Sequence, residues 1–225
     1  MIRSRFRSVL VAVVATLAIG ALSASVVSSA SAALPEWELT GGKNVPFTGT
    51  LPATGLREAG GAEYICAGGS ISGQISGTKE VSKVFIKFVC GNSNSNAFCT
   101  KNGLKANEWE TTELKGRLGY RSKSLRTVGL LLEPVSGHFA DCSRSGVLLA
   151  ILDSLIGEIT PLSQTNKLHL QYNQRSGSQE LQHFEGEEVI HNLEVEQVAF
   201  HSKQKLGVVA TWTLETGKSE VRIHA

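Results

Sequence analysis

The stretch Ser82–Cys90 reads SKVFIKFVC, and its period-two alternation indicates the fold class. The apolar face of this stretch comprises Val84, Ile86, Phe88 and Cys90. Lys83 and Lys87 fall on the opposite face. Because successive side chains of a β-strand point to opposite faces, this pattern is typical of a strand half buried against a core. We therefore predict a β-strand that ends at Cys90.

The same alternation recurs along the chain, at residues 114–120, 167–173, 206–214 and 220–224. Short segments rich in Gly, Ser, Asn and Pro separate these runs and are typical of turns. Many short strands at such spacing predict an all-β fold. We expect a single antiparallel β-sandwich or barrel-like domain over residues 45–225.

Two further segments need separate interpretation. Val147–Ile159 is apolar almost throughout and fits either a short helix or two buried strands. Asp153 and Ser154 interrupt it, and each apolar piece has the length of a strand, which favours two strands. Residues 33–44 contain Pro35 and two glycines, and we predict a loosely ordered N-terminal arm.

The first 32 residues have the parts of a secretory signal peptide. Three arginines precede position 8, the apolar run Val9–Leu22 follows, and the small residues Ala30, Ser31 and Ala32 come next. We predict a signal peptide at residues 1–32 that is cleaved after Ala32, and a secreted or cell-envelope-associated protein. The alternative is an uncleaved N-terminal anchor.

Cleavage would also change the charge balance. Loss of three arginines lowers the formal net charge from +2 to −1. A chain without a basic patch has little electrostatic attraction for nucleic acid. No other apolar stretch is long enough to span a bilayer. We expect an extracellular or cell-wall ligand, no nucleic acid and no transmembrane span in the mature chain.

The motif LPATG at residues 51–55 fits the pattern that sortases use to attach proteins to Gram-positive cell walls. It lies close to the predicted cleavage site, so cleavage after Thr54 would release the whole β-domain. Pro52 suits a strand edge or bend, because no ladder N–H is needed there. We therefore interpret the motif as part of the fold.

The sequence contains four cysteines, Cys66, Cys90, Cys99 and Cys142. An even number in an exported chain predicts disulfides, and three pairings are possible. A Cys90–Cys99 bridge would close a short polar loop and leave Cys66 to pair with Cys142. The alternative is a zinc site, which the absence of C-x₂₋₄-C spacing disfavours. We predict two disulfides and no metal.

A set of ordered blocks connects these features. The blocks are EYIC, GQISGTKEVSKVFIKFVCG, FCTKNG, LKGRLGY, VGLLLEP, FADC, GEITP and FEG. Between residues 46 and 216, the chain resembles an uncharacterised family of secreted proteins that some soil bacteria carry in many copies. The resemblance implies a secreted, β-rich bacterial domain, supports pairing Cys66 with Cys142, and implies no activity.

Histidines provide one set of candidate functional residues. The chain has six, and none occurs in an H-x-H pattern that would place two ligands on one strand face. His191 alternates with Val189 and Leu193 on an apolar face. We predict a partly buried histidine bonded to a backbone or carboxylate partner, with a role as ligand or base as the alternative.

Carboxylates provide another set. In a strand, Glu194 and Glu196 would share one face about 6.6–6.8 Å apart, which overlaps the range of an inverting glycosidase pair. Such enzymes take their pair from opposite sides of a cleft, so ordinary solvated charges are the preferred interpretation. No G-x-S-x-G elbow is present, and oxidised cysteines are not nucleophiles.

The remaining binding candidates flank the second cysteine. Trp109 is either an exposed stacking platform or a side chain packed under the loop. Asn92, Asn94 and Asn96 lie in that loop.

These observations favour a non-catalytic binding or structural role, with no catalytic residue or cofactor assigned. One alternative is a secreted glycan hydrolase that uses a carboxylate pair, with Glu194, Glu196 or Asp141 as candidates. A second alternative is a partner or inhibitor module that presents the Cys90–Cys99 loop.

Overall fold

The computed structural model describes residues 34–40, 42–90, 108–144 and 147–225, and these form strands and loops without a helix. The strands are β1 (Glu36–Leu39), β2 (Val45–Leu51), β3 (Thr54–Glu58), β4 (Glu63–Ile75), β5 (Glu80–Cys90), β6 (Glu108–Glu110), β7 (Leu114–Ser122), β8 (Thr127–Pro134), β9 (Ala140–Arg144), β10 (Val147–Leu152), β11 (Leu155–Thr160), β12 (Lys167–Tyr172), β13 (Gln174–Arg175), β14 (Ser178–Gln179), β15 (Glu194–Gln197), β16 (Ser202–Glu215) and β17 (Val221–His224). The predicted all-β class is confirmed.

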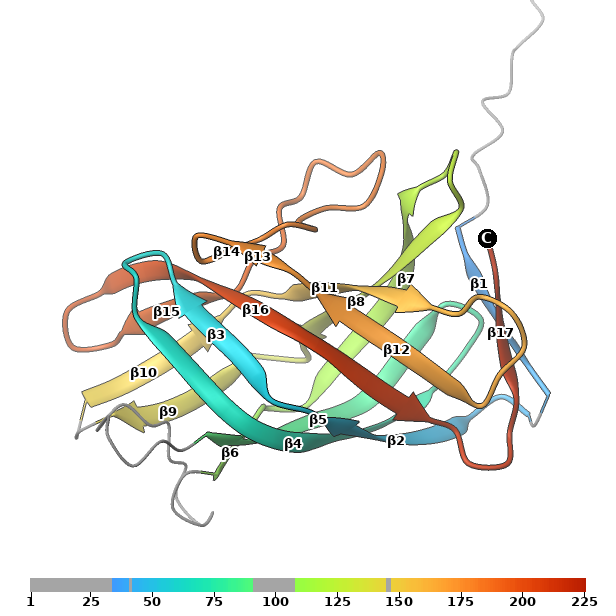
Figure 1. Ribbon diagram of the computed structural model, residues 1–225, viewed down its shortest axis with the longest axis horizontal. Coiled ribbons are helices and arrows are strands. Elements are labelled where there is room, and N and C mark those ends of the chain that lie inside the picture. Colours follow the sequence, from blue (N-terminus) through green and yellow to red (C-terminus); the bar gives the residue numbers. More distant parts are fainter. Residues whose placement is uncertain (1–33, 41, 91–107, 145–146) are drawn as a thin grey trace, which may run out of the picture. The chain divides into compact units, whose positions relative to one another are not determined.

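Most strands belong to one antiparallel sheet whose pairing closes on itself (Figure 1). The order is β12–β11–β8–β7–β5–β4–β2–β16, and β12 pairs again with β16. β3 also lies between β16 and β4, and the non-strand residues Pro52 and Ala53 separate it from β2. A closed pairing cycle is the arrangement that the barrel-like alternative requires.

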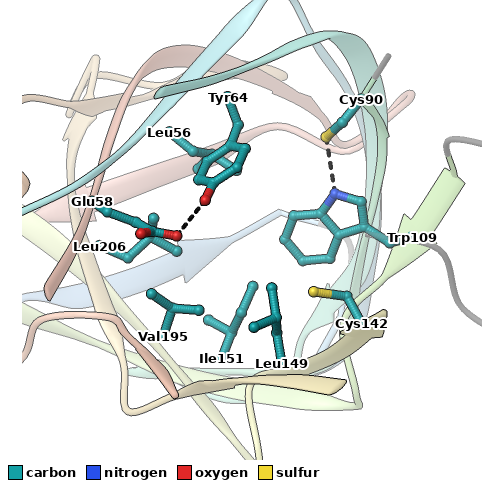
Figure 2. A pocket seen from close by; sticks show the side chains of 10 residues that line it. All are labelled: Leu56, Glu58, Tyr64, Cys90, Trp109, Cys142, Leu149, Ile151, Val195 and Leu206. Carbon is teal, nitrogen blue, oxygen red and sulfur yellow. Dashed lines mark hydrogen bonds between the residues drawn. The ribbon is translucent and has the colours of Figure 1, made fainter. Parts of the chain in front are cut away.

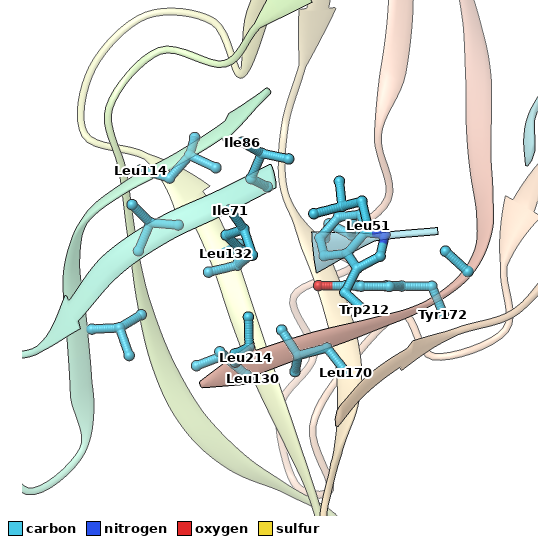
Figure 3. Packing of buried hydrophobic residues seen from close by; sticks show 14 of the residues in the cluster. Leu51, Ile71, Ile86, Leu114, Leu130, Leu132, Leu170, Tyr172, Trp212 and Leu214 are labelled. Atoms are coloured by element: carbon cyan, nitrogen blue, oxygen red, sulfur yellow. The ribbon is translucent and has the colours of Figure 1, made fainter. Parts of the chain in front are cut away.

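The interior of this closed sheet is the main core. In β5 the side chains of Val84, Ile86 and Phe88 are at most 2% exposed, so the predicted strand and its buried face are confirmed. Figure 3 shows leucine and isoleucine side chains from several strands gathered with Tyr172 and Trp212. Burial of such apolar surface is the dominant favourable term in folding.

The LPATG motif is part of this sheet. Leu51 ends β2 and Thr54 begins β3, and the two residues are 3% and 0% exposed. Pro52 falls in the break between the two strands, as predicted. The folded chain therefore presents no free LPATG peptide.

Three strands, β15, β10 and β9, extend the sheet from the N-terminal half of β16, and we call them the wing. Leu149 of β10 pairs with Gln197 of β15 and with Cys142 of β9. β10 and β11 are separated only by Asp153 and Ser154, so the prediction of two strands rather than a helix is confirmed.

The predicted loose arm is wrong where it contains β1. Residues 36–39 pair in antiparallel register with β17, and Trp37 is 4% exposed within the main core. Trp37 and Leu39 alternate with Glu36 and Glu38, but over only four residues. The burial of Trp37 comes from a partner strand almost the whole chain away, which a local pattern does not reveal.

The predicted cysteine pairing is also wrong. Cys66 is bonded to Cys90, and the two are direct cross-strand partners on β4 and β5 with Cα atoms 3.7 Å apart. The prediction treated the polar loop after Cys90 as the shortest closure and missed this strand register. Cys142 is also disulfide-bonded, and Cys99 lies outside the described residues.

In the part of the chain that the structure describes, no helix has the length and apolar character to cross a bilayer. The predicted signal peptide and its cleavage site lie outside the described residues, and they stay predictions.

Candidate functional site

An apolar pocket lies where the wing faces the β3–β4–β5 side of the closed sheet (Figure 2). The wing contributes Cys142, Leu149, Ile151 and Val195. The opposite wall contains Leu56, Glu58, Tyr64 and Leu206, and Cys90 and Trp109 complete the lining. The cavity measures about 30 Å³, roughly the space of two water molecules or the end of an alkyl chain.

The wing side of the pocket follows from strand alternation. Leu149 and Ile151 are two residues apart on β10 and therefore point to the same face. Val195 is the direct partner of Ile151 on β15. All three side chains are at most 7% exposed. The alternating pattern that builds the core therefore also builds this apolar wall.

Glu58 and Tyr64 supply the polar groups of the pocket. Glu58 is 7% exposed, and its Oε1 accepts a hydrogen bond from the Tyr64 hydroxyl. A tight turn joins β3 to β4, with the Glu58 N–H donating to the Ala62 carbonyl at 2.8 Å and Gly61 at φ 94°. Figure 2 shows the carboxylate and hydroxyl side by side at one end of the pocket. A carboxylate is thus placed against apolar walls, where burial of charge is costly unless hydrogen-bonded.

Trp109 is not an exposed platform. Its side chain is 2% exposed, stacks on Phe88 with ring centroids 4.4 Å apart, and donates from Nε1 to the Cys90 Sγ at 2.9 Å. Of the two alternatives for Trp109, the one with a packed side chain was correct about its burial. Trp109 contributes to the site as one wall of the pocket (Figure 2).

His191 is buried, but it does not lie in a strand. Residues 180–193 form a segment without strands between β14 and β15, which we call the strap. The apolar alternation around His191 was misleading, since Val189 is 61% exposed. The His191 Nδ1 lies 2.7 Å from the Ser154 hydroxyl, so its partner is neither the predicted backbone group nor a carboxylate.

The other candidates are not gathered at the pocket. Asn92, Asn94 and Asn96 lie outside the described residues. Glu194 and Glu196 both face Lys203, at 4.0 and 3.8 Å. Asp141 pairs with His138 on an exposed surface. Among the described residues, no group of three or more His, Cys, Asp or Glu side chains is arranged to hold a metal.

A second, polar depression lies on the outer face of β11 and β12. Glu158 and Gln171, which are cross-strand partners, line it together with Glu180 of the strap. Glu158 is held in an ion pair with Arg121. The two carboxylates come from different segments, but the ion pair suits Glu158 to hydrogen bonding rather than to proton transfer.

Sequence reasoning missed Glu58 and Tyr64. The available signal was the position of Glu58, which alternates with Thr54 and Leu56 on the buried face of β3. A charged residue on an apolar strand face is a departure from the pattern, and it marks a buried carboxylate. The long-range contact of this hairpin with the wing has no local signal.

No protein-family model, curated protein or solved structure matches this chain. The fold and the site together define an all-β protein with a closed antiparallel sheet and an apolar pocket that contains one carboxylate.

Proposed function

We propose that the protein is an exported, non-catalytic binding domain, and that the pocket receives the end of an apolar chain that carries a hydrogen-bond donor. One observation carries the proposal: a largely buried carboxylate, that of Glu58, lies in a pocket whose walls are otherwise almost entirely apolar. Apolar pockets with a few convergent polar groups are the usual form of small-molecule sites.

The lining favours one ligand chemistry. The wing residues Leu149, Ile151 and Val195 suit an alkyl group, and the small cavity suits a thin one. An ionised carboxylate only accepts hydrogen bonds, so Glu58 favours a hydroxyl or ammonium group on the ligand. A ligand with a carboxylate head would bring two like charges together in a poorly solvated place, and is disfavoured.

The same lining argues against catalysis. General acid–base catalysis needs groups that exchange protons with a reacting atom, most often histidine. The described lining contains no histidine and no serine or threonine hydroxyl, and its Glu58 and Tyr64 are hydrogen-bonded to each other. Its two cysteines, Cys90 and Cys142, are in disulfides and so are not nucleophiles.

Disulfide chemistry supports the export part of the proposal. Disulfides persist in oxidising compartments and are rare in the cytosol. The Cys66–Cys90 bridge therefore agrees with a signal peptide at residues 1–32 and a secreted or cell-envelope location. Cys142 is disulfide-bonded as well, which supports the proposal of two disulfides.

The two alternatives have less support. The hydrolase alternative assigned roles to Glu194, Glu196 and Asp141, which are engaged in surface ion pairs. The inhibitor alternative needed a Cys90–Cys99 bridge, and Cys90 is bonded to Cys66.

An NMR titration with butylamine, butanol and butyrate tests the proposed ligand chemistry. We expect butylamine and butanol to shift resonances of Leu149, Ile151 and Val195 with about millimolar affinity, as suits five-atom or six-atom ligands. Butyrate should bind at least about tenfold more weakly. Equal binding of all three probes, or shifts located elsewhere, would contradict the proposal.

Two variants make the titration specific. Glu58→Gln removes the charge and keeps the size, so the preference for butylamine over butyrate should disappear while butanol still binds. Val195→Phe fills the cavity and should abolish binding of every probe. Retention of binding by Val195→Phe would place the site elsewhere.

A further inference from the structure

The strap is held to the outer face of the closed sheet by one aromatic side chain. Phe184 is 1% exposed and sits on a surface formed by Gly119, Gly129, Leu131 and Ile156, which we call the seat. A methyl group at Gly119 would overlap the Phe184 ring, and one at Gly129 would lie 3.0 Å from it. The two glycines therefore create the room that Phe184 occupies.

Polar contacts hold the strap on both sides of Phe184. The Glu185 N–H donates to the Tyr120 carbonyl at 2.7 Å, and the Glu185 carboxylate accepts from the Lys123 N–H. Arg117 makes two hydrogen bonds of 2.8 Å to Glu187 and lies 5.1 Å from the centroid of the Phe184 ring. These contacts come from β7 and the turn after it.

At its C-terminal end the strap is held by His191. The Ser154 hydroxyl donates to Asp153 Oδ1 at 2.8 Å and lies 2.7 Å from His191 Nδ1. Because the hydroxyl has only one proton, it accepts from His191, and the neutral ring carries its proton on Nδ1. Asp153 has a φ of 69°, a sparsely populated conformation for a residue other than glycine. The chain Asp153–Ser154–His191 thus fixes the turn between β10 and β11 to the strap.

In acid, the second ring nitrogen of His191, Nε2, becomes protonated. His191 Nε2 is buried and has no hydrogen-bond partner. Protonation would place a donor there, and a buried donor without an acceptor is destabilising. The state in which the strap is attached therefore favours neutral His191.

Charged groups around the ring act in both directions. Burial lowers the pKa of His191 most strongly. Asp153 in the turn, Glu187 in the strap and Glu133 of β8 favour the protonated ring, whereas Arg117 of β7 opposes it. The net effect is a pKa below the usual value.

We propose that residues 180–193 form an acid-sensitive latch, in which neutral His191 holds the strap against the sheet and protonation of His191 weakens the attachment. Opening of the latch withdraws Phe184 from the seat and exposes the apolar side chains of Leu131 and Ile156, which are each 1% exposed when the strap is attached. The latch shares no residue with the apolar pocket, so its test does not depend on the proposed ligand.

The direction of the effect follows from linkage. The detached strap leaves His191 in water, where its pKa is near 6.5. The attached strap lowers that pKa, so the detached state binds more protons as the pH falls below 6.5. Attachment is therefore strongest above pH 6.5 and weakens as the pH falls toward the lowered pKa. The hydrogen bonds from Arg117 lower the pKa of Glu187, so protonation of Glu187 adds further weakening only at more acidic pH.

Hydrogen exchange of the full mature chain tests the latch. The strap amides that donate to Tyr120 and Gln182, those of Glu185 and His191, are the reporters. We expect their protection, corrected for the intrinsic exchange rate, to fall between pH 7.5 and pH 5. The fall should reach about tenfold for each unit by which the pKa of His191 is lowered. Amides of β5 should be unchanged.

His191→Gln should remove this pH dependence. His183→Gln is the matched control, because His183 is on the same strap with an exposed side chain, and it should keep the wild-type behaviour. Wild-type protection that is constant between pH 7.5 and pH 5 would overturn the proposal, as would pH dependence that persists in His191→Gln.

A direct titration keeps the proposal testable if the variant is itself poorly folded. In the wild type, the NMR signal of the His191 ring and the strap amides should titrate with one midpoint below pH 6.5. Different midpoints for the ring and the amides would overturn the latch.

Discussion

Two concave regions of the molecule differ in whether the chain itself fills them. The seat on the outer face of β7, β8 and β11 is filled by the chain itself, through Phe184 of the strap. The pocket between the wing and β3–β4 is left open by the described residues, although most of its lining is apolar. Both are buried apolar surfaces built on alternating strand residues.

The seat and the pocket differ in whether glycines form part of their surface. The seat exists because Gly119 and Gly129 leave room for one ring, and interiors are packed closely enough that one methyl group is felt. The pocket contains no glycine and contains a carboxylate instead. The seat is therefore a packing device, whereas the pocket keeps a polar group that packing alone does not require.

The largest effect is expected from loss of the Cys66–Cys90 disulfide. The bridge spans a sequence separation of 24, and loop entropy gives about 3.5 kcal/mol of lost stability in the double variant Cys66→Ala/Cys90→Ala. The pocket should lose more protection than the seat, because Trp109 also loses its hydrogen-bond acceptor. Urea denaturation and hydrogen exchange measure the two effects, and equal loss at both regions would contradict the comparison.

Gly119→Ala should be the most damaging small change at the seat. Overpacking a filled site typically costs about 1–3 kcal/mol, and here the added methyl group meets the Phe184 ring. Gly55→Ala is the matched control, since Gly55 is also in a strand and has nothing within 4 Å of the added atom. Similar urea midpoints for the two variants would show that Phe184 does not fill the seat.

Enlarging a side chain at the pocket should be tolerated. Val195→Phe is expected to change stability by less than about 1 kcal/mol, because the added ring would occupy free volume in the pocket and the backbone would not need to move. Thermal unfolding of Val195→Phe and of Gly119→Ala under the same conditions measures the contrast directly. A loss larger than that of Gly119→Ala would mean that the pocket is already filled.

The smallest difference between the seat and the pocket is expected in how their stability depends on pH. Since burial lowers the pKa of His191, stability of the strap is highest above pH 6.5 and falls as the pH drops through the lowered pKa. The stability difference between wild type and His191→Gln should therefore depend on pH between 7.5 and 5, while that between wild type and Val195→Phe should not. Urea titrations across this range provide the measurement, and parallel curves for both pairs would refute the distinction.

Alternating strands are the part of the fold that the sequence predicts well. Val84, Ile86 and Phe88 are buried as their spacing indicates, and the turn at Asp153 and Ser154 divides two strands as expected. Each of these features depends on near neighbours in the chain, because strand burial follows a period of two residues. The closure of the sheet depends on pairing between β12 and β16, for which no local pattern exists.

The site was harder to predict for the same reason. Cys66 pairs with Cys90 because two strands align in register, and loop length gave the wrong partner. His191 lies in a strap whose apolar residues imitate a strand, and its hydroxyl partner comes from a turn 37 residues away. Glu58 was detectable only as an exception on a buried face, and its role depends on a wing that joins much later in the chain.

A crystal of the protein soaked with butylamine would show whether the pocket receives an apolar chain with a hydrogen-bond donor. We expect the alkyl chain between Leu149, Ile151 and Val195, with the nitrogen within hydrogen-bond distance of the Glu58 carboxylate. A soak with butyrate under the same conditions should leave the pocket without the probe. Butylamine absent from the pocket, or present there with its nitrogen turned away from Glu58, would contradict the account.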